Sequence, residues 1–160
     1  MGGRRGEGVG WGVFAAAEPQ LAAAGRERLY KYGPGLAFLA TLRADGAPRL
    51  HPVCPTIVGD GLWVLIGPSP KLHDLRRDGR YALHTFPDAE VDDEFYVSGV
   101  AVPSDDEEQR RQVREDNLSR GATSGDEDVL FELLLDRALH SKYGPRPSWP
   151  PEYTRWQAEG

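Results

Sequence analysis

The chain has 160 residues, a formal net charge of −6 at pH 7 and hydrophobic side chains at 39% of its positions. This length predicts one domain with a buried core, and the acidic balance argues against a general nucleic-acid-binding protein, which needs a basic face. A single cysteine excludes an intramolecular disulfide, and no apolar run approaches the roughly 20 residues that a membrane-spanning helix needs, so we expect a cytoplasmic protein with neither membrane nor nucleic acid as its partner.

The expected elements, in chain order, are a tail, a helix and then mostly strands. Residues 1–12 are rich in glycine and arginine and predict a disordered tail, and residues 18–32 predict a helix that ends at a Gly-Pro-Gly sequence. Strand-like runs cover residues 36–43, 48–57, 62–66, 80–86, 94–102, 129–135 and 137–143. An Asp-Gly pair at residues 45–46 predicts a hairpin between the first two runs, and the prolines of the second run predict an edge or a bulge.

Two further helices and a C-terminal arm complete the chain. Residues 71–78 predict a short amphipathic helix, and Ser104 with Glu107 forms a capping box that predicts a helix start. Residues 144–160 form a proline-rich arm with several aromatic side chains, which we assign to the same domain. About six antiparallel strands with a few peripheral helices indicate an α+β, mainly β fold, a small β-barrel that occupies residues 13–143.

The corner Ser69-Pro70-Lys71 joins an apolar strand that ends in glycine to the short helix. Backbone amides and the positive end of the helix dipole favour an anion at a helix start, and Lys71 adds a full positive charge. A phosphate monoester carries roughly −1.5 to −2, which two cations with the amides would balance and one lysine alone would not. We therefore expect phosphate at this corner, with solvated edge charges as the alternative explanation.

Other reactive side chains have plainer explanations. His51 would suit a proton donor, but a packed or hydrogen-bonded strand histidine is the competing interpretation. Cys54 lies among Val and Pro, which is typical of a small apolar filler. Ser69 and Ser98 have no base that the sequence assigns to them, and no pair of histidines has metal-ligand spacing. We therefore assign no catalytic residue and no metal site.

Four stretches of the sequence form a pattern that, through their order and spacing taken together, is specific for one fold. They are Leu39–Val53, Ser69–Lys71, Leu75–Leu83 and Glu94–Gly99. Together they resemble the flavin-binding split-barrel superfamily of pyridoxamine 5′-phosphate oxidase-like proteins, over about residues 36–102. The resemblance implies a six-stranded antiparallel split β-barrel that acts as a homodimer, with cofactor sites across the dimer interface.

The same resemblance implies which residues bind the cofactor. Arg49 and Lys71 would hold the flavin phosphate, Ser69 would add a hydroxyl, and the backbone of residues 50–53 would contact the isoalloxazine ring. Glu94 falls where the vitamin-processing oxidases commonly carry a flavin-contacting glutamine. The implied cofactor-binding residues are Arg49, Leu50, His51, Pro52, Val53, Ser69, Lys71 and Glu94.

The chain departs from the vitamin-processing oxidases in three ways. It has Glu94 in place of glutamine and Cys54 in place of a lysine, and it lacks their C-terminal arginine and histidine motif. We therefore expect an FMN-binding oxidoreductase that transfers hydride or electrons to or from a small substrate, and not a genuine pyridoxamine 5′-phosphate oxidase. Because the flavin carries the reactivity, the catalytic residues stay unassigned.

Two alternatives share the fold. One is a deazaflavin-dependent reductase, whose basic groove would use Arg76, Arg77 and Arg80. The other is a non-catalytic flavin- or haem-binding protein, for which the available axial ligands are His51, His84 and His140. In either case Trp149, Tyr153 and Trp156 of the arm would stack on a ring or hold the arm against the partner subunit.

Overall fold

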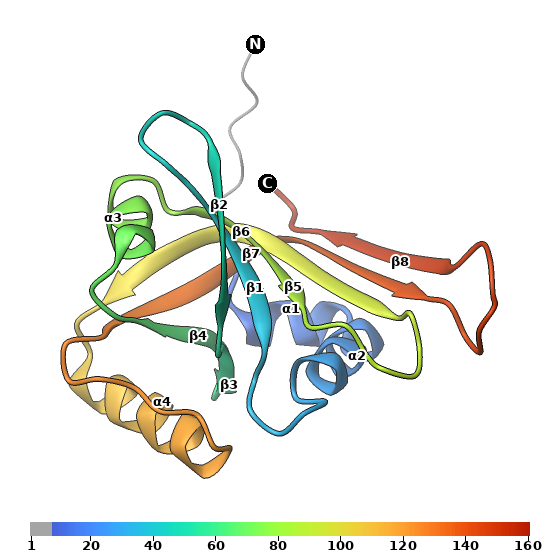
Figure 1. Cartoon of the computed structure of the whole chain (residues 1–160), viewed down its shortest axis with the longest axis horizontal. Helices are drawn as coiled ribbons and strands as arrows, with labels where there is room; N and C mark the ends of the chain where they lie inside the picture. The colour runs from blue at the N-terminus through green and yellow to red at the C-terminus, as the bar shows by residue number, and fades with distance from the viewer. Residues whose placement is uncertain (1–7) are drawn as a thin grey trace.

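The computed structural model describes residues 8–160, which form one antiparallel sheet with helices around it (Figure 1). The expected tail lies outside the described residues as far as residue 7. Residues 8–12 differ from that expectation. Val9 and Leu135 exchange two backbone hydrogen bonds of 2.8 and 2.7 Å, and Trp11, only 6% exposed, begins helix α1 (Trp11–Ala17). The glycine-rich composition of this segment gave no indication that Trp11 is part of the core.

Eight strands make up the sheet in the described part of the chain. They are β1 (Ala37–Leu42), β2 (Pro48–Val53), β3 (Thr56–Val58), β4 (Gly61–Ile66), β5 (Arg80–Thr85), β6 (Glu94–Ser104), β7 (Val129–Lys142) and β8 (Glu152–Gln157). Hydrogen bonds connect them in the order β2-β1-β5-β6-β7-β4-β3, and β8 pairs with β7. The mainly β, α+β class is confirmed. The strand count is eight rather than six, and the two ends of the order, β2 and β3, do not pair, so the sheet is not closed.

The difference in strand count has local causes. The run predicted at residues 48–57 divides at Cys54-Pro55, where proline has no N–H to donate to a ladder. The runs predicted at 129–135 and 137–143 are one strand instead. Asp136 between them has no partner on β6 and forms a bulge. The last part of the proline-rich arm pairs with β7 as β8.

The remaining helices are α2 (Pro19–Leu29), α3 (Pro70–Arg77) and α4 (Glu107–Ser119). None of the helices in residues 8–160 is long and apolar enough to cross a membrane. Helix α4 begins after Asp106, whose carboxylate accepts a hydrogen bond from the N–H of Gln109 at 3.0 Å. The predicted capping box is wrong, because Ser104 belongs to the end of β6 and Asp106 supplies the cap.

Alternation along the strands separates a buried inner face from an outward face. The inner side chains Val64, Val97 and Leu133 are fully buried, together with Phe14 of α1. Helix α2 packs closely on this face at Gly25, where a Cβ atom would lie 2.3 Å from the ring of Phe95. The hairpin between β1 and β2 is confirmed. It brings β2 to the edge of the sheet that α3 overlies, and this edge holds the predicted site.

Candidate functional site

The corner between β4 and α3 has the predicted strand-to-helix geometry. Pro70 occupies a first-turn position, where its missing N–H costs no helical hydrogen bond. The Ser69 hydroxyl donates to the carbonyl of Gly67 at 2.9 Å, and the N–H of Leu72 donates to the carbonyl of Ser69 at 3.1 Å. Within residues 8–160, the Lys71 N–H is thus the first-turn amide without a backbone partner. Side chains must supply most of the attraction for an anion here.

Strand β2 presents its side chains alternately to two sides. In register with β1, Arg49 lies beside Thr41 and His51 lies beside Leu39, so both face α3. Leu50 lies between them in sequence, points outward and is 64% exposed. Arg49 and His51 therefore meet Lys71 at the corner, whereas Leu50 belongs to a different surface.

Asp74 of α3 organises this corner, and sequence reasoning missed it. Its buried carboxylate, 3% exposed, accepts hydrogen bonds from Arg49 Nε at 2.7 Å, Thr41 Oγ1 at 2.8 Å and Arg77 Nη2 at 3.4 Å. We call these four residues the Asp74 cluster. In sequence, Lys71, Asp74 and Arg77 stand three apart, which ordinarily indicates surface ion pairs on a helix. No local signal marks Asp74 as buried.

The electrostatics of the corner follow from these contacts. Burial by itself raises the pKa of Asp74, but the hydrogen bonds from Arg49 and Thr41 outweigh it and hold the pKa below its ordinary value. Burial lowers the pKa of His51 below 6.5, and the charges of Lys71 and Arg49 lower it further against the pull of Asp74. The corner therefore combines an ionised carboxylate with a histidine that is neutral at pH 7.

Other predicted residues lie elsewhere. Glu94 begins β6, which β1 and β5 separate from β2, and its Oε1 atom lies 3.8 Å from His84 Nε2. His84 Nδ1 contacts the carbonyl of Thr85 at 2.7 Å. Burial raises the pKa of the Cys54 thiol, as expected for an apolar filler. In residues 8–160, no group of three or more His, Cys, Asp and Glu side chains could hold a metal ion. One copy of the chain thus does not bring Glu94 to the corner.

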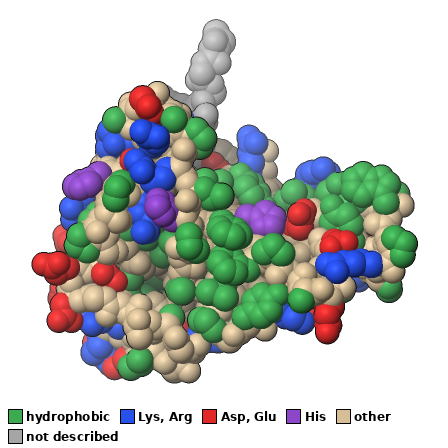
Figure 2. Space-filling view, viewed as in Figure 1, with side chains coloured by type: hydrophobic (Ala, Val, Ile, Leu, Met, Phe, Trp, Pro, Cys, Tyr) green, Lys and Arg blue, Asp and Glu red, His purple; other side chains and the backbone are tan. Residues whose placement is uncertain are grey.

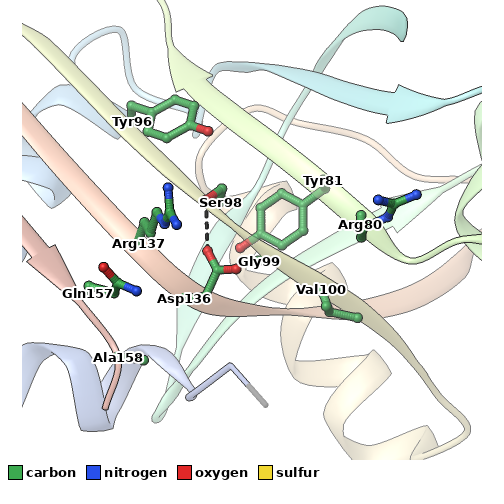
Figure 3. A pocket seen from close by; sticks show the side chains of 10 residues that line it. All are labelled: Arg80, Tyr81, Tyr96, Ser98, Gly99, Val100, Asp136, Arg137, Gln157 and Ala158. Carbon is green, nitrogen blue, oxygen red and sulfur yellow. Dashed lines mark hydrogen bonds between the residues drawn. The ribbon is translucent and has the colours of Figure 1, made fainter. Parts of the chain in front are cut away.

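A hollow lies on the outward face, beside the bulge of β7 and apart from the corner. This cavity of about 490 Å³ is shown in Figure 3. The bulge turns Asp136 toward Ser98, whose hydroxyl donates to Asp136 Oδ1 at 2.8 Å. Tyr81 donates to the carbonyl of Leu134 at 3.0 Å, and Arg137 flanks the opening. Ser98 therefore has an acidic partner that the sequence did not reveal. The lining contains no histidine, so it offers no base for a serine nucleophile.

Apolar side chains gather on the outward face of the sheet (Figure 2). Leu50, Ala40, Ala82 and Ser98 stand in one row across β2, β1, β5 and β6. Leu50 and Val100 are 64% and 39% exposed. Apolar side chains exposed on one face in this way are a feature of interaction surfaces where they form a contiguous patch.

The aromatic residues of the arm divide into two groups. Trp156 packs on Phe14 of the core, with ring centroids 5.0 Å apart, and so is not available to stack on a ligand. Trp149 and Tyr153 are 77% and 44% exposed. The hairpin of β7 and β8 carries them away from the body of the molecule (Figure 1).

The comparisons bear on the fold. A scan against family models finds no match, and a search of the curated proteins finds no similar sequence. Among solved structures, the chain is similar to the heme-binding protein from Mycobacterium smegmatis, with a TM-score of 0.61 and 20% identity over 82% of this chain and 57% of that one. The chain thus spans little more than half of that protein's length.

Two further neighbours are closer in length. A candidate pyridoxamine 5′-phosphate oxidase from Listeria innocua has a TM-score of 0.57 and 17% identity over 71% of this chain and 91% of that one. PhzG from Burkholderia lata 383, in complex with tetrahydrophenazine-1-carboxylic acid, has a TM-score of 0.53 and 16% identity over 92% and 93%. These neighbours are split-barrel proteins like pyridoxamine 5′-phosphate oxidase, so the likeness in fold to that group is confirmed, whereas the expected six-stranded barrel is an eight-stranded sheet that is not closed.

Proposed function

We propose that this protein is an FMN-binding oxidoreductase of the pyridoxamine 5′-phosphate oxidase-like family, acting on a small substrate other than that of the vitamin-processing enzyme. The observation that carries the proposal is that Arg49, held by Asp74 of α3, and Lys71, in the first turn of that helix, both lie close enough to His51 for their charges to act on it. Arg49 uses only its Nε in hydrogen bonds within residues 8–160, and Lys71 forms no ion pair there. Both therefore have donors to offer a phosphate.

The charge of the corner favours a phosphate monoester such as that of FMN over a phosphate diester. Arg77 pairs with the Asp74 carboxylate, so Arg49 and Lys71 leave the corner a net charge of about +2, with His51 neutral. A phosphate monoester carries roughly −1.5 to −2 and matches this value. A phosphate diester carries one negative charge fewer than a monoester, so part of the positive charge of the corner would remain unbalanced.

When bound, the flavin would supply hydride or electron transfer. The residues of this chain would hold it: Arg49 and Lys71 at the phosphate, and the backbone of residues 50–53 along the ring. The hydroxyl hydrogen of Ser69 is used in the hydrogen bond to the carbonyl of Gly67. In this arrangement the Ser69 oxygen would serve as an acceptor and not as a donor to the phosphate. The catalytic residues stay unassigned.

We further propose a homodimer with the cofactor sites at its interface. The apolar outward face around Leu50 supports this, because its exposure is unusual for a single free chain. If Glu94 contacts the cofactor, it must come from a second copy, because one copy does not bring its own Glu94 to the corner. The cytoplasmic location stays a prediction.

The alternatives are weaker on specific contacts. Arg80 is engaged by Asp78 at 2.6 Å and Arg77 by Asp74, so two of the three arginines of the deazaflavin groove are already occupied. A non-catalytic haem-binding protein is favoured by the likeness to the M. smegmatis protein. Its best axial ligand would be His84, half-buried on the outward face, although its Nδ1 contacts the carbonyl of Thr85 and its Nε2 lies 3.8 Å from Glu94 Oε1.

The deciding experiment is a parallel titration of the purified protein with FMN, riboflavin, a deazaflavin cofactor and haem, followed by absorbance and fluorescence. Saturable binding of FMN, tighter than that of riboflavin, is the expected result. A preference for the deazaflavin or for haem would replace the proposal with the corresponding alternative. Equal affinity for FMN and riboflavin would show that the corner does not bind the phosphate.

A further inference from the structure

We propose that Asp74 is a positioning residue for the phosphate site: it holds the Arg49 guanidinium by its Nε, so that the two terminal nitrogens are presented to the phosphate. This inference rests on the proposed function and adds a role for a residue that does not itself touch the ligand. The bond in question is the 2.7 Å contact from Arg49 Nε to Asp74 Oδ2.

The choice of Nε matters for the geometry of arginine. The guanidinium is planar and has five N–H donors, and one bond at Nε fixes the plane while it leaves the four donors of Nη1 and Nη2. In residues 8–160 those two nitrogens make no hydrogen bond to another group, and the Arg49 side chain is 26% exposed. A forked arrangement of this kind binds phosphate oxygens in pairs.

Asp74 is itself held in place from three elements. Thr41 of β1 donates to the same Oδ2 atom at 2.8 Å, Arg77 of α3 donates to Oδ1 at 3.4 Å, and Arg49 comes from β2. Arg77 also donates to the carbonyl of Leu42, which ties α3 to the end of β1. The Asp74 carboxylate is therefore held in one position and orients the Arg49 side chain before a ligand binds. Arg49 then loses less conformational entropy on binding.

The rival explanation is that the cluster only attaches α3 to the sheet. The attachment role is examined with the control variant below, and a simple charge effect is separated from positioning by Asp74→Asn, which keeps the size of the side chain and removes its charge. Electrostatics alone would strengthen phosphate binding in this variant, because a negative charge near the phosphate disappears. Loss of positioning would weaken it. The sign of the change therefore separates positioning from simple charge effects.

The test measures the affinities of FMN and riboflavin for the wild-type protein and for Asp74→Asn, and compares their ratio. We expect the preference for FMN over riboflavin to fall about tenfold while riboflavin affinity stays the same. An unchanged or increased preference would overturn the inference. A wild-type protein with no preference for FMN would instead overturn the proposed function, so the two failures are distinguishable.

Asp116→Asn is the matched control. Asp116 accepts hydrogen bonds from Thr56 and from Arg120 Nε, the latter at 3.1 Å, in a similar set of partners far from the corner. It should lower stability without changing the FMN preference. If Asp74→Asn does not fold, Arg49→Lys tests the same point: a lysine keeps the charge but cannot bond Asp74 and present a fork. An unchanged preference in Arg49→Lys would overturn the inference as well.

Discussion

Two polar clusters in this molecule are built from the same three residue types, aspartate, threonine and arginine. They differ in the surroundings of the arginine side chain. In the Asp74 cluster, a threonine and two arginines surround a buried carboxylate. In the second, which we call the Asp116 cluster, Thr56 and Arg120 donate to Asp116, and Tyr30 lies 3.0 Å from the Thr56 hydroxyl. Each cluster ties a helix to a strand that is distant in sequence.

The difference lies in what surrounds the unused donors. In the Asp116 cluster, Tyr30 accepts from the N–H of Ile57 at 2.7 Å and its ring covers the Arg120 guanidinium at 3.8 Å. The terminal nitrogens of Arg120 make no hydrogen bond within residues 8–160, but the Tyr30 ring covers the guanidinium, so we call this cluster closed. In the Asp74 cluster, the terminal nitrogens of Arg49 are also without a partner in residues 8–160, no ring in that part of the chain covers them, and Lys71 stands one turn before Asp74 on α3, so we call this cluster open. A guanidinium that packs on a ring contributes to stability, whereas an uncovered one can turn its donors to a ligand.

The largest effect is expected where the cluster is closed. Thr56→Val should lower the free energy of unfolding by about 2 kcal/mol, because Thr56 is 0% exposed and its loss leaves Asp116 and Tyr30 each short of a partner. Thr41→Val should cost about 1 kcal/mol, since Asp74 keeps both arginines. Urea unfolding measures both. Equal losses would mean that the clusters do not differ as described.

The next effect is on binding at the open cluster. Lys71→Ala should weaken FMN binding by about 1–3 kcal/mol, the scale of a lost charge-assisted hydrogen bond, and leave riboflavin binding unchanged. Parallel fluorescence titrations with the two ligands measure this. Arg76→Ala is the matched control, because Arg76 is an exposed cation of the same helix outside the cluster. An effect of the same size in both variants would mean that Lys71 acts only through the general positive potential of α3 and not through a contact with the phosphate.

The sequence allowed the corner to be predicted but not the residue that organises it. The Asp-Gly hairpin and the strand ending in glycine are local patterns, and both are confirmed. Asp74 binds Arg49 across 25 positions, and Thr56 binds Asp116 across 60. Contacts at such separations depend on how the sheet folds back, which spacing along one strand or helix does not encode.

Other departures have the same origin. Asp136 forms a bulge only because β6 lies opposite, and Trp11 is buried only because the core reaches the start of α1. The Ser104 capping box failed for a different reason: two acidic residues follow it, and Asp106 is the better placed cap. Local signals therefore predicted the elements, and partners from elsewhere in the chain decided the details of the site.

A smaller effect concerns the surface next to the open cluster. If the outward face is a dimer interface, Leu50→Glu should weaken self-association by about tenfold or more, because a charge would be buried against apolar side chains. Leu118→Glu is the control, since Leu118 lies beside the closed cluster in α4 and is 68% exposed against 64% for Leu50. Sedimentation velocity measures both. A monomeric wild-type protein, or dissociation by either variant alike, would contradict the assignment.

The smallest expected effect concerns His51, whose pKa responds to the charges of the open cluster and of Lys71. Burial and the charges of Lys71 and Arg49 put its folded-state pKa below 6.5, against the opposite pull of Asp74. The unfolded chain therefore takes up the proton first, so this contribution to stability is present above pH 6.5 and is lost as the pH falls below it. FMN should shrink that loss, because its phosphate offsets the cations and lets His51 protonate in the folded state. Urea midpoints of wild type and His51→Gln, above and below pH 6.5 and with and without FMN, measure the effect. The same slope with pH in both proteins would show that His51 does not sense the corner.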